Sequence, residues 1–482
     1  MATSRVRQRW AAGLLVCALC APGLGCRQES FDEVFPVPDD LYAATAVGTD
    51  HLWAAGYFGA IYRTRDGGES WQKLDSLTEK SIYAISFADN RHGWATGRRG
   101  FVIHTTDGGD TWKRQELPRK PARHIFAIHA LDQNRVWAVG DWGGRYYSAD
   151  GGETWRDRSF LIHEDHPAFK YLSEAELEAF NRGEPIYDDI YLNDVYFIDD
   201  QRGWLVGEYG LIYVTENGGE TWEQAQIIGA VHFDDIEFPS MESEIPRSLW
   251  PPLFASAEIL LEKEYLRLRI DACLTPAEYR RTGTTTLADD RAESLRDFLE
   301  SEGVSQDRIR MVNPTPFDEE SVDMQAFVRS KLCDRPHVSV EVVETPFLFD
   351  VKIRSDGHGL IAGLGGVILR SDDWGRTWTY AESDSRQAFF AVGHGAGRLV
   401  AVGEKGLKRV SKDGGRTWQR PRQGFPPIVS FMRDLVFPTD ARGWIVGAES
   451  MVLRSSDGGL TWEEVSLYAE QRTGASERAA GE

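Results

Sequence analysis

The sequence predicts a mainly β fold, namely a seven-bladed β-propeller with four antiparallel strands per blade and an inserted α/β domain. A turn of the form Asp-Gly-Gly-x-Thr-Trp, with small variations, occurs seven times. A short apolar strand that ends in glycine precedes every copy. Apart from two longer intervals, the copies are about 42 residues apart, which is the length of a four-stranded blade. The 482 residues exceed the usual ~100–200 of a single domain, so both parts can be accommodated.

Residues 1–25 are expected to form a secretory signal peptide. Arginines at positions 5, 7 and 9 precede an apolar run over 10–21, and a small-residue stretch leads to Cys26. This end resembles a bacterial lipobox, which implies a lipid on Cys26, with residues 26–40 as a tether; ordinary signal-peptidase cleavage nearby is the alternative. No later segment has the ~20 apolar residues of a spanning helix. We expect a lipid-anchored protein on the periplasmic side of the envelope, at the outer membrane.

The repeated turn is expected to have a structural role. Aspartate is short enough to accept hydrogen bonds from backbone N–H groups of its own turn, and the glycine two positions later can adopt a positive φ at little cost. Threonine and tryptophan then re-enter a strand, where β-branched and aromatic side chains pack well. The residues that open the seven turns are Asp66, Asp107, Asp150, Asn217, Asp373, Asp413 and Asp457.

The strands of each repeat can be located from this turn. Trp94-Ala-Thr-Gly97 and Phe101-Val-Ile-His-Thr105 illustrate the two strands that precede an Asp turn. With one more strand on either side, blades one to four occupy 41–228 and blades five to seven occupy 346–468. The two longer intervals place a helical insertion at about 156–190 and a separate domain at 229–345. Residues 469–482 are expected to be a disordered tail.

These repeats resemble the BNR, or Asp-box, repeats of sialidase-like propellers, and the stretch from Ser371 to Trp378 carries the complete pattern. The pairing that runs from Trp94 to Trp112 makes the chain more similar to the photosystem II stability and assembly factor family. This resemblance implies a non-catalytic, seven-bladed scaffold that binds membrane-protein subunits during assembly. The photosynthetic members bind through an arginine-bearing patch, for which the chain offers only Arg98 and Arg99.

The insert at 229–345 has an α/β pattern of its own. Strand character occurs at 232–238, 266–270, 308–312 and 338–342. Helical character occurs at 249–261, at 286–302 and around 322–332. In the smaller insertion, a helix is expected at 172–180.

The predicted helix that contains Arg291, together with the strand after it, resembles the core of OmpA-like domains, which grip peptidoglycan. In that family an arginine and an aspartate hold the diaminopimelate group; Arg291 is present, but Leu274 or Thr275 stands where the aspartate belongs. A weak peptidoglycan contact through Arg291 and reuse of the domain for protein contact are the two interpretations, and the second is favoured. Cys273 and Cys333 form either a disulfide or two buried thiols.

The turn between the second and third strands of each blade is expected on the same rim as the links between blades, so both insertions would project from one face. The Asp turns would lie on the other rim. Exposed aromatic and arginine side chains provide large contact area at low entropy cost, and we expect them to bind a partner protein. Packing beneath the insertions is the alternative. The predicted partner-binding residues are Tyr57, Phe58, Arg98, Arg99, Trp142 and Tyr209.

Charge and motifs narrow the function further. The net charge of −21 repels phosphate backbones, which argues against a nucleic-acid partner. We find no Ser-His-Asp elbow, phosphate loop or sialidase Arg-Ile-Pro signature, and the stretch 163–166 lacks the spacing of a metal site. The prediction is a protein-interaction scaffold without enzyme activity, cofactor or metal. A glycan-binding or glycoside-cleaving periplasmic propeller is the alternative.

Overall fold

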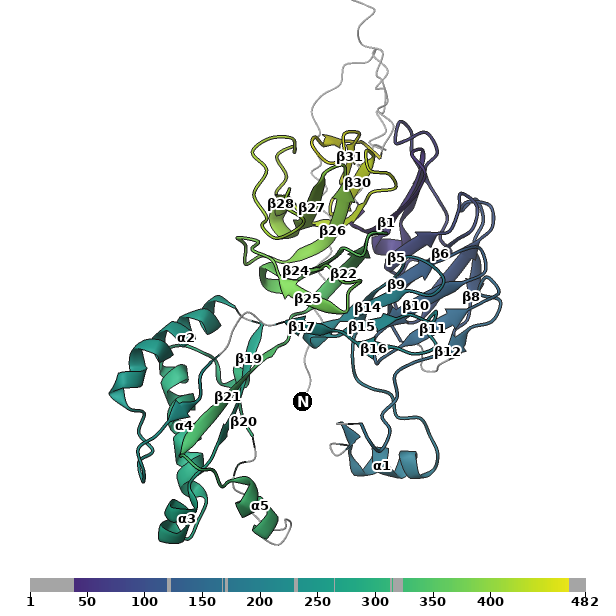
Figure 1. Cartoon of the computed structure of the whole chain (residues 1–482). Coiled ribbons are helices and arrows are strands. Elements are labelled where there is room, and N and C mark those ends of the chain that lie inside the picture. Colours follow the sequence, from purple (N-terminus) through teal and green to yellow (C-terminus); the bar gives the residue numbers. More distant parts are fainter. Residues whose placement is uncertain are drawn as a thin grey trace, which may run out of the picture. The chain divides into compact units, whose positions relative to one another are not determined.

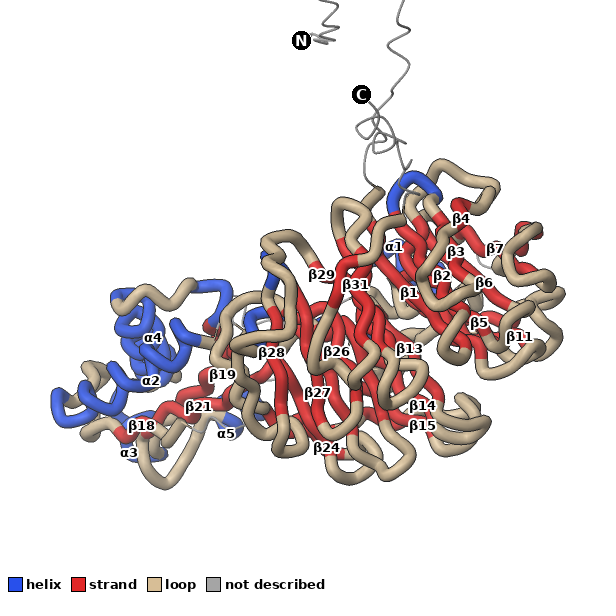
Figure 2. Tube along the Cα trace, turned by 90° about the horizontal axis from the view of Figure 1, so that it is seen from above, coloured by secondary structure: helices blue, strands red, loops and turns tan. Residues whose placement is uncertain are grey.

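The computed structural model describes residues 39–118, 123–166, 168–169, 172–228, 233–263, 265–312, 314 and 324–467. The predicted signal peptide, Cys26, most of the tether and the tail at 469–482 lie outside the described residues. The fold is mainly β, with helices concentrated in the larger insertion (Figures 1 and 2). Among the helices of the described ranges, none is long and apolar enough to cross a membrane.

Seven sheets follow one another along the described chain, one for each predicted repeat, and we call them repeat sheets 1 to 7. Repeat sheets 1 and 2 contain β1 (Leu41–Val47), β2 (His51–Gly56), β3 (Ile61–Thr64), β4 (Gln72–Lys73), β5 (Ile82–Phe87), β6 (Gly93–Gly97), β7 (Phe101–Thr105) and β8 (Lys113–Gln115). Repeat sheets 3 and 4 contain β9 (Ile125–Ala130), β10 (Val136–Gly140), β11 (Arg145–Ser148), β12 (Arg156–Asp157), β13 (Leu192–Phe197), β14 (Gly203–Gly207), β15 (Ile212–Thr215) and β16 (Glu223–Gln224).

The remaining repeat sheets follow the larger insertion. Repeat sheets 5 and 6 contain β22 (Leu348–Ile353), β23 (Gly359–Gly363), β24 (Ile368–Ser371), β25 (Thr377–Tyr380), β26 (Phe389–Gly395), β27 (Arg398–Gly403) and β28 (Lys408–Ser411). Repeat sheet 7 contains β29 (Met432–Val436), β30 (Gly443–Gly447), β31 (Val452–Ser455) and β32 (Glu463–Glu464). The strands of each repeat pair antiparallel in chain order, which is the meander expected when short turns join consecutive strands.

Two repeat sheets depart from the predicted four strands. Repeat sheet 6 has three, because its fourth segment is reduced to a single bridge between Val410 and Gln419. Repeat sheet 5 gains a fifth, β17 (Gln226–Ile228), which pairs parallel to β25. Residues 226–228 were predicted to end the fourth blade, but they pair with β25 of repeat sheet 5.

The two repeated signatures pack against each other across neighbouring sheets. The indole N–H of Trp53, in repeat sheet 1, donates to the Gly108 carbonyl in the Asp turn of repeat sheet 2 at 2.9 Å. A Cβ on Gly68, in the Asp turn of repeat sheet 1, would lie 2.5 Å from the ring of Trp444 in repeat sheet 7. The second glycine of the motif therefore leaves room for the strand tryptophan of the adjoining sheet, in addition to its positive φ of 91°.

The larger insertion forms an α/β unit around a mixed sheet. Its elements are β18 (Ile236–Glu237), α2 (Trp250–Glu262), β19 (Leu266–Ala272), α3 (Pro276–Thr282), α4 (Thr286–Ser301), β20 (Ile309–Met311), α5 (Met324–Ser330) and β21 (His337–Glu344). The strand order is β18-β21-β19-β20. Apolar side chains of α2, α4 and the strands share one core, in which Leu260, Leu268, Ile270 and Leu295 are almost fully buried.

One helix of this unit, α3, was not predicted from the sequence. Thr275 caps α3 by accepting the Glu278 backbone N–H, while the Glu278 side chain accepts the Thr275 backbone N–H. Pro276 occupies the first turn and Gly283 ends the helix at a φ of 74°. In the smaller insertion, α1 (Glu174–Asn181) forms where a helix was expected, with Ser173 and Glu176 as its capping box.

Candidate functional site

The Asp turns are saturated with internal hydrogen bonds. The Asp107 carboxylate accepts the Thr111 backbone N–H at 2.9 Å, the Thr111 hydroxyl at 2.6 Å and the Thr105 hydroxyl at 2.7 Å. Burial opposes ionisation of Asp107, but these hydrogen bonds outweigh it and lower the pKa to about 2. Corresponding turn contacts recur at Asp66, Asp150, Asn217, Asp373, Asp413 and Asp457. These side chains hold the hairpins in shape and have little capacity left for a ligand.

The predicted partner-binding residues lie in the turns between second and third strands of repeat sheets 1 to 4. The second residue of each of these turns has a left-handed backbone, with φ values of 50° at Phe58, 59° at Arg99, 54° at Trp142 and 57° at Tyr209. Bulky residues rarely adopt this conformation, and Gly365 holds the equivalent place in repeat sheet 5. Lys405 and Glu449 have the same conformation in repeat sheets 6 and 7, so the left-handed residue belongs to the repeated turn.

Most of these side chains reach solvent. Tyr57, Phe58 and Tyr209 are 43%, 64% and 57% exposed. Arg98 and Arg99 are exposed as well. Trp142 is half-buried, and the Arg123 guanidinium lies 4.2 Å from the centre of its ring. That these residues bind a partner stays a prediction.

We call the first strand of each repeat the innermost strand of its sheet. A backbone hydrogen bond joins each of these turns to the residue directly before the innermost strand of the same sheet. The Tyr57 N–H donates to the Asp40 carbonyl at 2.8 Å, and the Glu208 N–H donates to the Tyr191 carbonyl at 3.1 Å. Equivalent bonds occur in the other five repeat sheets. The turns and the first residues of the innermost strands therefore lie at the same end of every sheet, which we call the turn end.

A group of aromatic residues at the turn end was not predicted. In each innermost strand the first residue is buried, and the next one faces the cavity described below. Five of these second residues are aromatic and one is arginine, and we call these six the aromatic belt: Tyr42, Tyr83, Phe126, Phe349, Phe390 and Arg433. Asn193 takes the place in repeat sheet 4.

Belt residues of neighbouring sheets contact one another. The ring centres of Tyr42 and Tyr83 are 6.4 Å apart, and those of Tyr83 and Phe126 are 6.0 Å apart. Phe390 has the Arg433 guanidinium 4.6 Å from its ring centre. The signal in the sequence is an aromatic residue directly after the first apolar residue of the innermost strand, and it becomes visible only once the repeats are aligned.

The belt forms part of the wall of a cavity of about 390 Å³ that all seven innermost strands line. Each innermost strand contacts the next one along the chain, and β29 contacts β1. A surface built in this way combines residues from every repeat, although no two belt positions are close in sequence.

Three aspartates and one lysine also line the cavity. Asp194 and Asp350 each accept a backbone N–H from the innermost strand of the following repeat sheet, at 3.0 and 2.8 Å, and Asp434 accepts the Ala44 N–H of repeat sheet 1 at 2.7 Å. Lys352 forms ion pairs with Asp350 and, at 3.8 Å, with Asp194. These aspartates fasten neighbouring sheets together, which is a structural use of the carboxylates.

Burial and charge shift the titration of this group. Burial raises the pKa of Asp194 to about 7, although the nearby Lys352 ammonium acts in the opposite direction. Burial likewise raises the pKa of Asp434. For Lys352, burial disfavours the charged form, but the carboxylates of Asp350 and Asp194 outweigh it and raise the pKa.

Both insertions are joined to the turn end by backbone hydrogen bonds. After β12, the Phe160 N–H donates to the Gly143 carbonyl at 3.0 Å, and the Gly143 N–H donates to the Ile190 carbonyl at 2.7 Å. Where the larger insertion ends, the Gly210 N–H donates to the Pro346 carbonyl at 2.7 Å. The smaller insertion therefore begins and ends beside the turn of repeat sheet 3, and the larger insertion ends beside the turn of repeat sheet 4.

Arg291 does not lie where the predicted peptidoglycan contact requires it. Its side chain is fully buried and forms an ion pair with the buried Glu278 at 2.7 Å. Its remaining donors reach the carbonyl oxygens of Glu242, Cys273 and Pro239. The prediction that Arg291 contacts peptidoglycan does not fit this structure, because Glu278 and backbone carbonyl oxygens of the insert already accept the hydrogen bonds of the guanidinium.

The two cysteines of the insert are joined as a disulfide, Cys273–Cys333, in the structure. In the smaller insertion, the His166 ring at the end of the stretch 163–166 lies 3.6 Å from the Asp188 carboxylate. Burial raises the pKa of Asp188, with the His166 ring acting against this shift.

One family model matches part of the sequence. Residues 35–175 match the family model described as photosynthesis system II assembly factor YCF48. This match covers less than half of the chain, and the segment resembles that family over repeat sheets 1 to 3. No protein of curated function matches the sequence.

Two YCF48 proteins are among the solved structures that match the chain. One, titled YCF48 bound to D1 peptide, is 17% identical with a TM-score of 0.48, over 87% of this chain and 92% of that chain. YCF48 from Cyanidioschyzon merolae is 16% identical with a TM-score of 0.38, over 87% of this chain and 96% of that chain. The WD40 β-propeller domain of Doa1 is 8% identical with a TM-score of 0.44, over 88% and 96% of the two chains.

Proposed function

We propose that this protein is a non-catalytic, assembly-factor-like scaffold that binds another protein at the turn end. The observation that carries the proposal is the aromatic belt, which surrounds the cavity at the same end as the exposed Tyr57, Phe58 and Tyr209. Aromatic and arginine side chains dominate the energetics of protein interfaces, because they bury large areas with few rotatable bonds.

The chemistry of this surface suits an extended or loop segment of a protein partner. The belt offers ring faces, and the Arg433 guanidinium lies over Phe390 and Phe431, at 4.6 and 4.8 Å from their ring centres. A guanidinium held flat on aromatic rings still has edge N–H groups to offer to a carboxylate or carbonyl oxygen. The resemblance of residues 35–175 to an assembly-factor family supports the same class of function.

The proposal includes a closed ring of seven blades, in which repeat sheet 7 adjoins repeat sheet 1. Three observations support closure. The Asp434 carboxylate accepts the Ala44 N–H, and the Ser450 N–H donates to the Asp39 carbonyl at 2.8 Å. The rings of Trp71 and Trp444 meet edge to face with centres 6.1 Å apart.

Anchoring and location belong to the proposal as well. We propose that a lipid on Cys26 holds the chain on the periplasmic side of the bacterial envelope, and that the larger insertion provides a second protein contact. Metabolic labelling with a clickable fatty acid tests the anchor. Labelled protein should appear in the membrane fraction, and Cys26→Ser should remove the label and release the chain; a label that persists in Cys26→Ser contradicts the anchor.

Affinity capture tests the binding surface. The tagged full chain is purified from detergent-solubilised envelopes of the producing cell, and co-purifying proteins are identified by mass spectrometry. We expect Tyr83→Ala with Phe126→Ala, and separately Trp142→Ala with Tyr209→Ala, to lose the partner. Leu460→Ala is the matched control, since this leucine is 48% exposed in an Asp turn at the opposite end of the strands. Retention by both double variants would contradict the proposal.

A further inference from the structure

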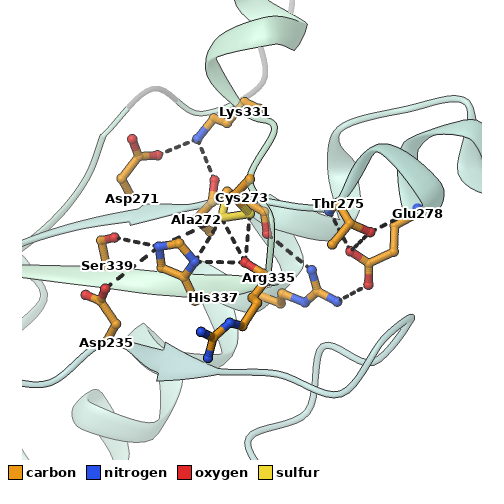
Figure 3. Close-up of a disulfide and its surroundings, with 12 residues drawn as sticks. Asp235, Asp271, Ala272, Cys273, Thr275, Glu278, Lys331, Arg335, His337 and Ser339 are labelled. Atoms are coloured by element: carbon orange, nitrogen blue, oxygen red, sulfur yellow. Dashed lines mark hydrogen bonds and ion pairs between the residues drawn. A yellow bond between two sulfur atoms is a disulfide. The ribbon is translucent and has the colours of Figure 1, made fainter.

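A histidine lies against the disulfide of the insert (Figure 3). The Nδ1 atom of His337 is 3.2 Å from Cys273 Sγ. The sulfur atoms of Cys273 and Cys333 and a ring nitrogen of His337 all lie within 4.8 Å of one another, which makes them the group of potential metal ligands found among the described residues. Two thiolates and an imidazole are a ligand set that zinc prefers.

We propose that the insert holds a redox-gated zinc site, in which Cys273, Cys333 and His337 bind one Zn²⁺ after the disulfide is reduced. A dithiol reductant supplies two electrons and two protons. The S–S bond breaks to give two thiols, and the dithiol becomes a disulfide. Zn²⁺ then displaces the two thiol protons, and both thiolates and the imidazole share the ion. While the disulfide persists, neither sulfur carries the charge that zinc requires.

The backbone positions the three ligands independently of the disulfide. Cys273 directly follows β19 and His337 begins β21, and the Cys273 N–H donates to the His337 carbonyl at 3.0 Å. Cys333 follows α5, and its N–H donates to the Leu274 carbonyl at 3.1 Å. These ladder bonds remain when the sulfur atoms separate, so reduction leaves the three side chains directed at one point.

The distances fit a tetrahedral ion after small side-chain rotations. With Zn–S of about 2.3 Å and Zn–N of about 2.05 Å, tetrahedral angles separate the two sulfurs by about 3.8 Å and a sulfur from the nitrogen by about 3.6 Å. The Cα atoms of the cysteines are 5.9 Å apart, and the Cys273 Sγ to His337 Nδ1 distance is already 3.2 Å. Rotation of the cysteine side chains opens the remaining space.

The surroundings can support the ligands. His337 Nε2 is 3.0 Å from the Ser339 hydroxyl, which can accept its proton when Nδ1 binds the ion, and the Asp235 carboxylate lies 3.8 Å from the same nitrogen. Nδ1 must then give up its 2.9 Å contact with the Arg335 carbonyl. The Lys331 ammonium beside β19 is already paired with the Asp271 carboxylate at 2.6 Å, so the site depends on the three ligands and the backbone that places them.

Cobalt binding tests the site on the full chain. The protein is reduced with a phosphine, transferred to anaerobic buffer and titrated with Co²⁺, whose thiolate charge-transfer band reports sulfur ligation; Zn²⁺ is then added in competition. We expect one equivalent of Co²⁺ to give the band in reduced protein, none in oxidised protein, and Zn²⁺ to remove it.

Variants assign the ligands. His337→Gln keeps both cysteines, so its fold can be checked in the oxidised state, and it should weaken Co²⁺ binding at least about tenfold. His358→Gln, an exposed histidine of repeat sheet 5, is the matched control and should bind as the wild type. Cys273→Ser should abolish the band. The proposal is overturned if reduced protein shows no band, if His337→Gln binds as tightly as wild type, or if the band survives in Cys273→Ser with Cys333→Ser.

Discussion

Replacement of Asp350 by alanine should destabilise the repeat sheets more than any single exposed substitution. Asp350 is buried at 6% exposure in the innermost strand of repeat sheet 5. Its carboxylate accepts the N–H of the fully buried Val392, in repeat sheet 6, at 2.8 Å and also pairs with Lys352. Alanine removes both interactions.

The expected magnitude follows from the two losses. A buried N–H left without an acceptor costs about 1–3 kcal/mol. Removal of one partner from a fully buried ion pair costs about 3–5 kcal/mol, but Lys352 is 29% exposed and keeps Asp194, so only part of this applies. We expect Asp350→Ala to lower the free energy of unfolding by about 3 kcal/mol. Asp350→Asn retains an acceptor for Val392 and should lose roughly 1 kcal/mol.

Urea unfolding followed by tryptophan fluorescence measures these differences, provided that refolding is reversible. The exposed Asp165→Ala is the control and should stay within about 0.5 kcal/mol of the wild type. The reasoning fails if Asp350→Ala lies within the same margin as Asp165→Ala, or if Asp350→Asn loses as much as Asp350→Ala.

Three further predictions concern charge and cross-links. Because the folded-state pKa of Asp194 is raised to about 7, the folded chain binds this proton more tightly than the unfolded chain, and stability is lost as pH rises from about 4 to 7. The melting temperature of Asp194→Asn should therefore rise relative to that of the wild type between pH 5 and pH 8, and a difference in melting temperature that stays constant with pH would refute this. The pKa of Asp107 is lowered to about 2, so the stabilisation by its ionised carboxylate is present above about pH 4 and is lost as pH falls towards 2. In urea unfolding, Asp107→Ala should cost about 1 kcal/mol at pH 7 and much less at pH 2.5, and an equal cost at both pH values would contradict a stabilising role of the ionised form. Replacing both Cys273 and Cys333 by serine should lower the stability of the insert by about 2–4 kcal/mol. Amide hydrogen exchange should become faster in α4 and stay unchanged in β6, and an α4 that exchanges equally fast in the variant and the wild type would argue against the prediction.

The sequence was most informative where one residue type is required by local geometry. The Asp turn repeats because a short carboxylate and glycines are needed within the same few residues, so Asp107 and its six equivalents mark a hairpin wherever they occur. The helix of the insert that contains Arg291 was likewise predicted, from its apolar spacing and its glycine stop. By contrast, α3 was overlooked although Thr275-Pro276-Ala-Glu278 carried a capping box.

The candidate site was only partly predictable. Turn residues such as Phe58 and Tyr209 could be located because glycine patterns mark their turns. Belt residues such as Tyr83 have no motif of their own, and their contacts exist only because innermost strands far apart in sequence line one cavity. For Arg291, the residue type suggested a ligand contact, but burial against Glu278 depends on tertiary packing that sequence spacing does not report.

Site-specific photo-cross-linking tests most directly whether a protein binds at the turn end. A photoreactive phenylalanine analogue replaces Tyr83 in one chain and Leu460 in another, and intact cells that produce each chain are irradiated. The account predicts a discrete cross-linked protein from position 83 and none from position 460, which lies at the opposite end of the strands and is 48% exposed. A cross-linked protein obtained from position 460 alone, or from neither position, would contradict the account.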